Sequence, residues 1–151
     1  MSRSIKFRAW MPSQKKMFSA EEMASDQMAL LPDGHFANIH GVSTKLSQIY
    51  SHDEMLPLQF TGLLDKNGKE IYEGDVVKWS LVKGDIGEVV FDTKVIVEYR
   101  KEVYETVNEI SGWYVREGVR QMFGLAGAVK DNVIEIIGNI YENIDLLKGI
   151  K

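Results

Sequence analysis

Short stretches in which apolar and polar residues alternate, separated by turn residues, run along most of the chain. Residues 5–10 alternate with a period of two, which is typical of a half-buried strand. Pro12 favours a turn after them, and Met17-Phe18 indicates a short returning strand. Later strands are expected at residues 46–50, 58–63, 70–72, 76–79, 86–91, 95–99, 113–115 and 133–141. Many short strands of this kind predict a mainly β protein, a barrel or a sandwich.

Residues 19–22, Ser-Ala-Glu-Glu, have the form of a helix N-terminus. In a capping box the serine hydroxyl accepts a backbone N–H three residues on, and the glutamate reaches back to the serine N–H. The pattern predicts a helix from about residue 20 to residue 30, with Met23 and Met28 on one face. A helix in this place makes an α+β fold the alternative to an all-β one.

Turn residues interrupt the strands of the second half. Asn67-Gly68, within residues 65–69, is typical of a hairpin turn that needs positive φ values. Gly74-Asp75 indicates another turn, in which the aspartate accepts nearby backbone N–H groups. Residues 92–94 are expected to separate two strands.

Several segments fit more than one structure. Residues 32–55 contain one clear turn, at 32–34, and residues 119–129 are ambiguous. Residues 100–110 place apolar side chains at spacings of four and three among charges, which fits an amphipathic helix or a long polar excursion of a hairpin. Residues 142–147 predict a terminal turn or short helix.

The strand pattern also suggests how the chain is organised. Residues 1–64 are expected to form an N-terminal extension made of a β-hairpin and a helix. Residues 65–151 are expected to form a small SH3-like β-barrel, on which the extension packs, with an inserted excursion near residues 100–130.

Composition narrows the class of protein. Hydrophobic residues make up 44% and charged residues 26% of the chain, which are the proportions of a globular protein. The lack of cysteine rules out disulfides, thiolate zinc sites and cysteine nucleophiles. Basic residues within 1–10 leave no room for the apolar core of a signal peptide, and no apolar run is long enough to span a bilayer. We therefore expect a cytoplasmic protein that does not contact membranes.

The net charge of −4 disfavours non-specific binding to nucleic acid, because phosphate contacts usually require a basic surface. One basic cluster lies on the first predicted hairpin: Lys6, Arg8, Lys15 and Lys16. Together with aromatic residues on a barrel face it would make a nucleic-acid-binding surface. A solvated face of the hairpin is the simpler interpretation.

Five segments together resemble the YopX family of phage and prophage proteins. They are residues 5–10 (IKFRAW), 59–63 (QFTGL), 65–77 (DKNGKEIYEGDVV), 87–91 (GEVVF) and 136–143 (IIGNIYEN). The resemblance spans nearly the whole chain, and its middle block is long and specific. It implies a phage-derived cytoplasmic protein with a mainly β fold, and it supplies no catalytic or binding residue.

Candidate chemistry is sparse. His35, His40 and His52 lie close in sequence, but their spacing matches no metal-site template, so loop histidines are the better interpretation. Residues 65–68 lack the later carboxylates of a calcium loop. Glu73 and Asp75 are a close carboxylate pair that turn chemistry explains better than acid–base catalysis. We expect no catalytic residue, no metal and no cofactor.

Three classes of function therefore stay open. The favoured one is a phage accessory protein that acts through protein–protein contacts, without catalysis and as a homo-oligomer. The alternative is a nucleic-acid-binding barrel of phage regulation or replication, and the third is an enzyme or metal protein around the histidines. Self-association is expected through Val103, Val107 and Ile110, because a single small barrel does not obviously cover these apolar positions.

Overall fold

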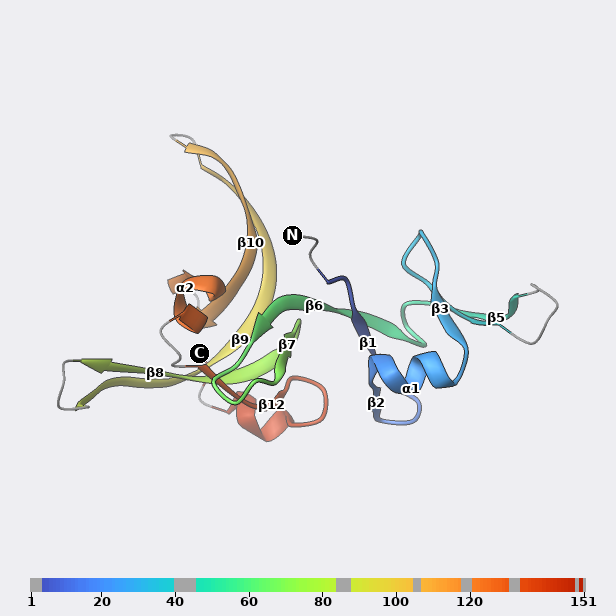
Figure 1. The fold of residues 1–151 in the computed structure, drawn as a ribbon, viewed down its shortest axis with the longest axis horizontal. Helices are drawn as coiled ribbons and strands as arrows, with labels where there is room; N and C mark the ends of the chain where they lie inside the picture. Colours follow the sequence, from blue (N-terminus) through green and yellow to red (C-terminus); the bar gives the residue numbers. More distant parts are fainter. Residues whose placement is uncertain are drawn as a thin grey trace. The chain divides into compact units, whose positions relative to one another are not determined.

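A computed structural model describes residues 4–39, 46–83, 88–104, 107–117, 121–130, 134–148 and 150 of the chain. The chain forms two compact units, Met1–Phe60 and Thr61–Lys151. Each unit is built mainly from antiparallel strands, drawn as arrows in Figure 1.

Unit 1 begins with the predicted hairpin. Its elements are β1 (Phe7–Met11), β2 (Lys16–Phe18), α1 (Ala20–Ser25), β3 (Met28–Leu30), β4 (Phe36–Ile39), β5 (Leu46–Tyr50) and the first part of β6 (Leu56–Leu64). Strand β1 lies between β2 and β6, and both pairings are antiparallel. A second sheet has the order β3-β4-β5. Alternate side chains of β1 face the core of this unit, because successive residues of a strand point to opposite faces.

The core of unit 1 gathers residues from both of its sheets and from α1. Its buried members are Ala9, Met11, Phe18, Met23, Phe36 and Met55. Phe7, Met28, Leu30 and Tyr50 pack against them. The period-two pattern of residues 5–10 therefore predicted the strand and its buried face at Phe7 and Ala9, whereas Ile5 precedes the strand and is 72% exposed.

The predicted capping box forms, but the helix is shorter than predicted. The Ser19 hydroxyl accepts the N–H of Glu22 at 3.1 Å, and the Glu22 carboxylate accepts the N–H of Ser19 at 2.9 Å. Helix α1 ends at Ser25, and Gln27 takes a φ of 53°. The prediction of helix to residue 30 was wrong because Met28–Leu30 instead pairs with β4.

Unit 2 is built on a five-stranded antiparallel sheet. Its elements are the end of β6, β7 (Glu70–Tyr72), β8 (Asp75–Lys83), β9 (Glu88–Tyr104), β10 (Val107–Glu117), β11 (Gln121–Gly124), α2 (Leu125–Lys130), β12 (Ile134–Asn139) and the 3-10 helix η1 (Ile144–Leu147). The sheet order is β11-β10-β9-β8-β12. Figure 1 shows β9 and β10 as a long, curved hairpin.

Strand β9 corrects the prediction of two strands with a turn at residues 92–94. Asp92, Thr93 and Lys94 pair in register with Ser80, Trp79 and Lys78 of β8, so the strand continues through them. Residues 100–104 of β9 pair with residues 107–112 of β10, which confirms the hairpin excursion and excludes the amphipathic helix there.

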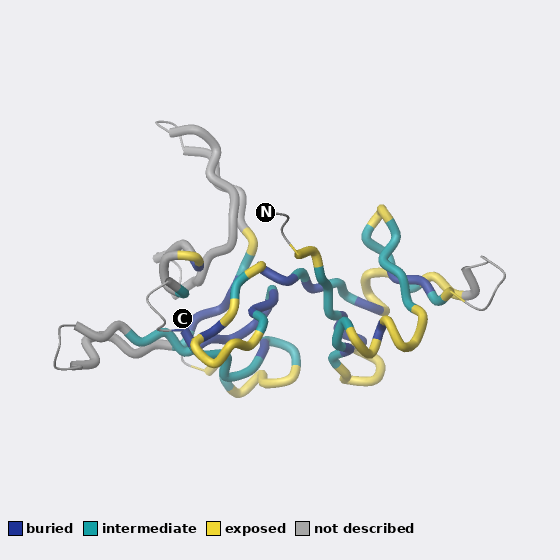
Figure 2. Tube along the Cα trace, viewed as in Figure 1, coloured by how far each residue is buried: buried dark blue, intermediate teal, exposed yellow. Residues whose placement is uncertain are grey.

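The core of unit 2 forms where β8, β9, β12 and α2 meet. Its buried members are Ile71, Val77, Val95, Val97, Leu125 and Ile134. In Figure 2 the buried part of this unit runs along β7 and the start of β8, and the turn after β6 is exposed. The apolar stretches at residues 76–79 and 95–99 thus predicted the strands that carry the core.

The prediction of a mainly β protein is confirmed, and the sheets are antiparallel and curled. SH3-like closure of the second unit stays a prediction. The predicted domain boundary after residue 64 also stays a prediction, because β6 runs continuously through Phe60 to Leu64.

Candidate functional site

The fold itself uses the buried polar side chains of Asp65, Asp75 and Asn139 in unit 2. Asp65 is 6% exposed, and its carboxylate accepts the backbone N–H groups of Asn67 at 2.8 Å, Lys69 at 2.9 Å and Ile136 at 3.1 Å. Burial raises the pKa of Asp65, but the N–H groups of Ile136, Lys69 and Asn67 together hold it below its ordinary value. One carboxylate thus joins the β6–β7 turn to β12.

The β6–β7 turn differs in detail from the predicted type. Asp65 and Lys69 close it with a backbone hydrogen bond of 2.8 Å, which leaves a three-residue loop. Of the loop residues, Gly68 takes a φ of 79°, whereas Asn67 does not have a positive φ. This is the geometry of a type I turn followed by a left-handed residue, so the asparagine contributes no left-handed residue.

The second predicted turn also forms as expected. The buried carboxylate of Asp75 accepts the N–H of Tyr72 at 2.8 Å, and Gly74 has a φ of 79°. The backbone of Gly74 donates to Val97 and accepts from Ile140. This turn therefore connects β9 with the segment after β12.

The third buried polar residue, Asn139, organises the turn that follows β12. Its side-chain oxygen accepts the N–H groups of Tyr141 at 3.0 Å and Glu142 at 2.9 Å, and its amide donates to the Glu142 carboxylate at 2.7 Å. The side-chain oxygen of Asn143 accepts the backbone N–H of Asn139 at 3.1 Å. The segments that resemble the YopX family in this unit are thus rich in side chains that hold the backbone.

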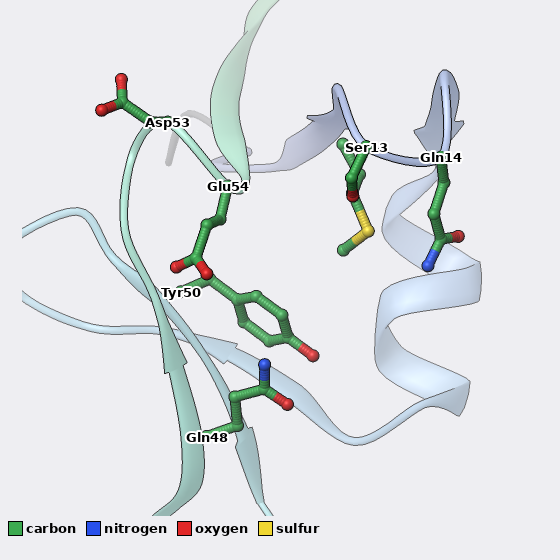
Figure 3. A pocket seen from close by; sticks show the side chains of 7 residues that line it. Ser13, Gln14, Gln48, Tyr50, Asp53 and Glu54 are labelled. Carbon is green, nitrogen blue, oxygen red and sulfur yellow. The ribbon is translucent and has the colours of Figure 1, made fainter.

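A pocket of about 390 Å³ lies in unit 1, between the β1–β2 turn and the end of β5. It is lined by Met11, Ser13, Gln14, Gln48, Tyr50, Asp53 and Glu54. Figure 3 shows Ser13 and Gln14 on one side and Tyr50 with Gln48 on the other. Its volume lies within the range of ordinary ligand sites.

The sequence positions these side chains through local rules. Strand β5 alternates, so Gln48 and Tyr50 share one face, where Tyr50 packs on the core beneath. Residues 51–54 form a turn in which the Ser51 carbonyl accepts the N–H groups of Glu54 and Met55. Pro12 begins the opposite turn, where the Met11 carbonyl accepts the N–H of Gln14 at 3.2 Å.

Glu54 supplies a fixed negative charge at the pocket. Its carboxylate accepts the backbone N–H of Ser51 at 2.8 Å and the Ser51 hydroxyl at 3.0 Å. The N–H of Ser51 lowers the pKa of Glu54, and the hydroxyl adds to the effect, so the group is ionised at neutral pH. In Figure 3 its side chain extends toward Tyr50, whereas Asp53 points away from the ring.

The lining is rich in hydrogen-bond acceptors. The Tyr50 hydroxyl accepts the Asn38 amide at 3.1 Å, which leaves the phenol hydrogen directed elsewhere. Two carboxylates, two side-chain amides and the Ser13 hydroxyl complete the polar lining, and none of the seven lining residues carries a positive charge. Such a site suits a ligand that donates hydrogen bonds and carries positive charge.

Two of the three histidines, His35 and His52, are described and belong to unit 1. The rings of His35 and His52 stack with centroids 4.4 Å apart, His35 Nδ1 lies 3.2 Å from the Asp33 carboxylate, and His52 Nε2 lies 3.1 Å from the Gly34 carbonyl. The N–H of His35, followed by its ring, lowers the pKa of Asp33. His40 lies outside the described residues. The structure assembles no group of three metal-ligating side chains in the part of the chain that it describes.

The four basic residues of the first hairpin do not share one face. Strand register places Arg8 opposite Leu58, whereas Lys16 lies opposite the core residue Met11. The Lys16 ammonium pairs with Glu22 at 3.1 Å and lies over the Phe18 ring. Lys6 lies 5.9 Å from the centre of the Phe60 ring, and Lys15 occupies the turn with a φ of 50°. Binding of nucleic acid through these residues stays a prediction.

The expected self-association residues lie in the β9–β10 hairpin. Val103 belongs to β9, and Val107 and Ile110 belong to β10. The structure describes their backbone, but their side chains lie outside the description. Their role in an oligomer stays a prediction.

Sequence reasoning missed the pocket as a site. Its residues come from segments 11–14, 48–50 and 53–54, and no motif links them. The one local signal is a pair of adjacent acids, Asp53-Glu54, that follows an alternating strand and precedes another.

Comparison with known proteins points to one family and one fold. A family model described as YopX protein matches residues 6–148. Among solved structures, the chain is similar to the crystal structure of protein EF1440 from Enterococcus faecalis, with 23% identity, a TM-score of 0.54 and coverage of 97% of this chain and 99% of that one. That likeness concerns the fold alone. No curated protein matches the chain.

Membrane crossing by a helix is also addressed by the structure. Over the residues that it describes, no helix combines the length and the apolar character that a bilayer span requires.

Proposed function

The chain belongs to the YopX family, and from this premise we propose that it is a phage or prophage accessory protein that acts by binding a protein partner in the cytoplasm. In this proposal it carries out no catalysis and needs no cofactor. In the same proposal, the partner binds at the pocket of unit 1, and the strands of unit 2 form an SH3-like barrel.

The observation that carries the proposal is how the two sets of acidic side chains are used. Asp65 and Asp75 are buried and accept backbone N–H groups of the fold. Glu54 is ionised and exposed beside a pocket of about 390 Å³ that offers further acceptors. A charged group in that position is available to a ligand, which supports a binding role.

Nucleic acid is the alternative partner. The pairing of Lys16 with Glu22 neutralises one of the four basic side chains, and the acidic total charge disfavours phosphate contacts. We therefore favour a protein partner. A homo-oligomer through Val103, Val107 and Ile110 is compatible with it, because those residues lie on a hairpin of unit 2.

A capture experiment tests the proposal. Tagged chain is expected to retain a protein from phage-infected cells, and the double variant Asp53→Asn with Glu54→Gln is expected to lose it. The control variant Glu21→Gln, which removes an exposed acid of α1, should retain the partner. Equal capture by all three proteins would contradict the pocket as the binding site.

A gel-shift series at low salt tests the alternative. Salt-sensitive binding of DNA or RNA that is lost in a Lys6→Ala and Arg8→Ala double variant would favour nucleic acid over a protein partner. We expect no such shift.

A further inference from the structure

We infer that the pocket of unit 1 receives an arginine side chain presented by a protein partner. The inference rests on the proposed binding role of this pocket and names the chemical group that it recognises. The charge of the pocket, its other hydrogen-bond acceptors and its apolar lining residues each favour this ligand.

The charge of the pocket selects a cation. Asp53 and Glu54 both line it, and Glu54 is held ionised by the N–H and hydroxyl of Ser51. No lining residue is basic, so the carboxylates face no positive group within the lining. A ligand that carries positive charge would therefore be attracted to the ionised carboxylate of Glu54.

The remaining acceptors select a ligand with several donors. Gln14 and Gln48 each offer a side-chain carbonyl, and the Tyr50 hydroxyl is already fixed by the donation from Asn38. Figure 3 shows these groups on both sides of the pocket rather than at one point. A guanidinium has five N–H donors in a planar fork, whereas an ammonium is a compact charge with three.

The apolar part of the lining selects the stem of the ligand. Met11 is buried, Tyr50 is half-buried, and both line the pocket. A guanidinium stacks on an aromatic ring while its edge donates to a carboxylate, and its methylene stem covers apolar surface. In the view of Figure 3 the Glu54 side chain extends toward Tyr50.

Nuclear magnetic resonance of the ¹⁵N-labelled full chain tests the inference. The ligand is N-acetyl-arginine amide, and the matched control is N-acetyl-citrulline amide, which has nearly the same shape without the charge. We expect saturable shifts of the amides of residues 13, 14, 48, 50, 53 and 54 with the arginine compound. Its affinity should exceed that of the citrulline compound by about tenfold or more.

Variants separate the pocket from the rest of the surface. Glu54→Gln should weaken the arginine compound by about tenfold, Asp53→Asn by less, and Glu21→Gln should leave its affinity unchanged. The unliganded spectrum of each variant shows whether it is folded.

Three outcomes would overturn the inference. They are absent or unsaturable shifts, equal binding of the citrulline compound, and equal loss of binding in Glu21→Gln. If one of these outcomes is found but the partner is still captured in a Glu54-dependent manner, the proposed function stands and the inference of an arginine ligand is rejected. If arginine binds saturably but no partner is captured, the pocket recognises the chemical group and the partner proposal fails.

Discussion

In both units polar side chains accept backbone N–H groups of turns, but these side chains are exposed in unit 1 and buried in unit 2. In unit 1, Ser19, Asp33 and Glu54 accept backbone N–H groups in exposed turns. In unit 2, Asp65, Asp75 and Asn139 do so while buried. An exposed N–H that loses its partner is solvated by water, whereas a buried one is left unsatisfied. The same type of residue therefore holds the fold in unit 2 and remains accessible to ligands in unit 1.

The largest difference is expected at Asp65. Asp65→Ala removes the acceptor for three backbone N–H groups and should lower the free energy of unfolding by about 3 kcal/mol. Asp53→Ala, at the exposed rim of the pocket, should change it by less than about 0.5 kcal/mol. Urea unfolding of both variants measures the contrast, and equal effects would contradict the role of burial.

The pH dependence of stability sharpens the same contrast. Because the pKa of Asp65 is lowered in the folded chain, its stabilisation is present above the unfolded pKa of about 3.9 and is lost as the pH falls through the lower folded value. Asp65→Asn should therefore show a shallower loss of stability than the parent chain on acidification below about pH 5. Asp33→Asn, whose lowered pKa belongs to an exposed group, should change the slope less. Thermal unfolding at a series of pH values measures both slopes.

Rules about neighbouring residues predicted the turns and the helix cap. The extents of α1 and β9 depend instead on strand pairing with distant segments. The capping box and the Gly74-Asp75 turn depend on neighbouring residues alone, so the sequence is sufficient for them. The end of α1 and the continuity of β9 through residues 92–94 depend on pairing with β4 and β8, which lie elsewhere in the sequence. Polar residues at 92–94 resemble a turn until a partner strand satisfies their backbone.

The pocket of unit 1 could be predicted from the sequence even less than the extents of these elements. Each lining residue is ordinary for its segment: a turn serine, strand residues on one face, and acids in a turn. Their meeting depends on how β5 and the β1–β2 hairpin pack on the shared core of Met11 and Tyr50. A site without a motif is therefore found only from the fold, whereas the Gly74-Asp75 turn of unit 2 is found from the sequence.

A smaller difference is expected between two glycines with the same backbone conformation. Gly74 and Gly68 both have a φ of 79°, but a Cβ at Gly74 would lie 3.2 Å from a ring carbon of Tyr141, and one at Gly68 would meet nothing within 4 Å. Gly68→Ala should cost about 1 kcal/mol for backbone strain alone, and Gly74→Ala about 2 kcal/mol. Chemical unfolding of the two variants compares them. Equal costs would show that the neighbours of Gly74 move aside freely.

The smallest effect is expected at Ser19. Its hydroxyl accepts one backbone N–H in an exposed turn, whereas the buried Asp65 carboxylate accepts three. Ser19→Ala leaves the N–H of Glu22 without its side-chain acceptor, but water reaches that group. The cost should be about 1 kcal/mol, the usual value for a helix N-cap, and well below that of Asp65→Ala. Ser13→Ala, in the exposed β1–β2 turn, should cost less than about 0.5 kcal/mol. Hydrogen exchange at the Glu22 amide and urea unfolding measure the loss. A cost at Ser19 equal to that at Asp65 would mean that the bond itself, and not its burial, sets the stability of both units.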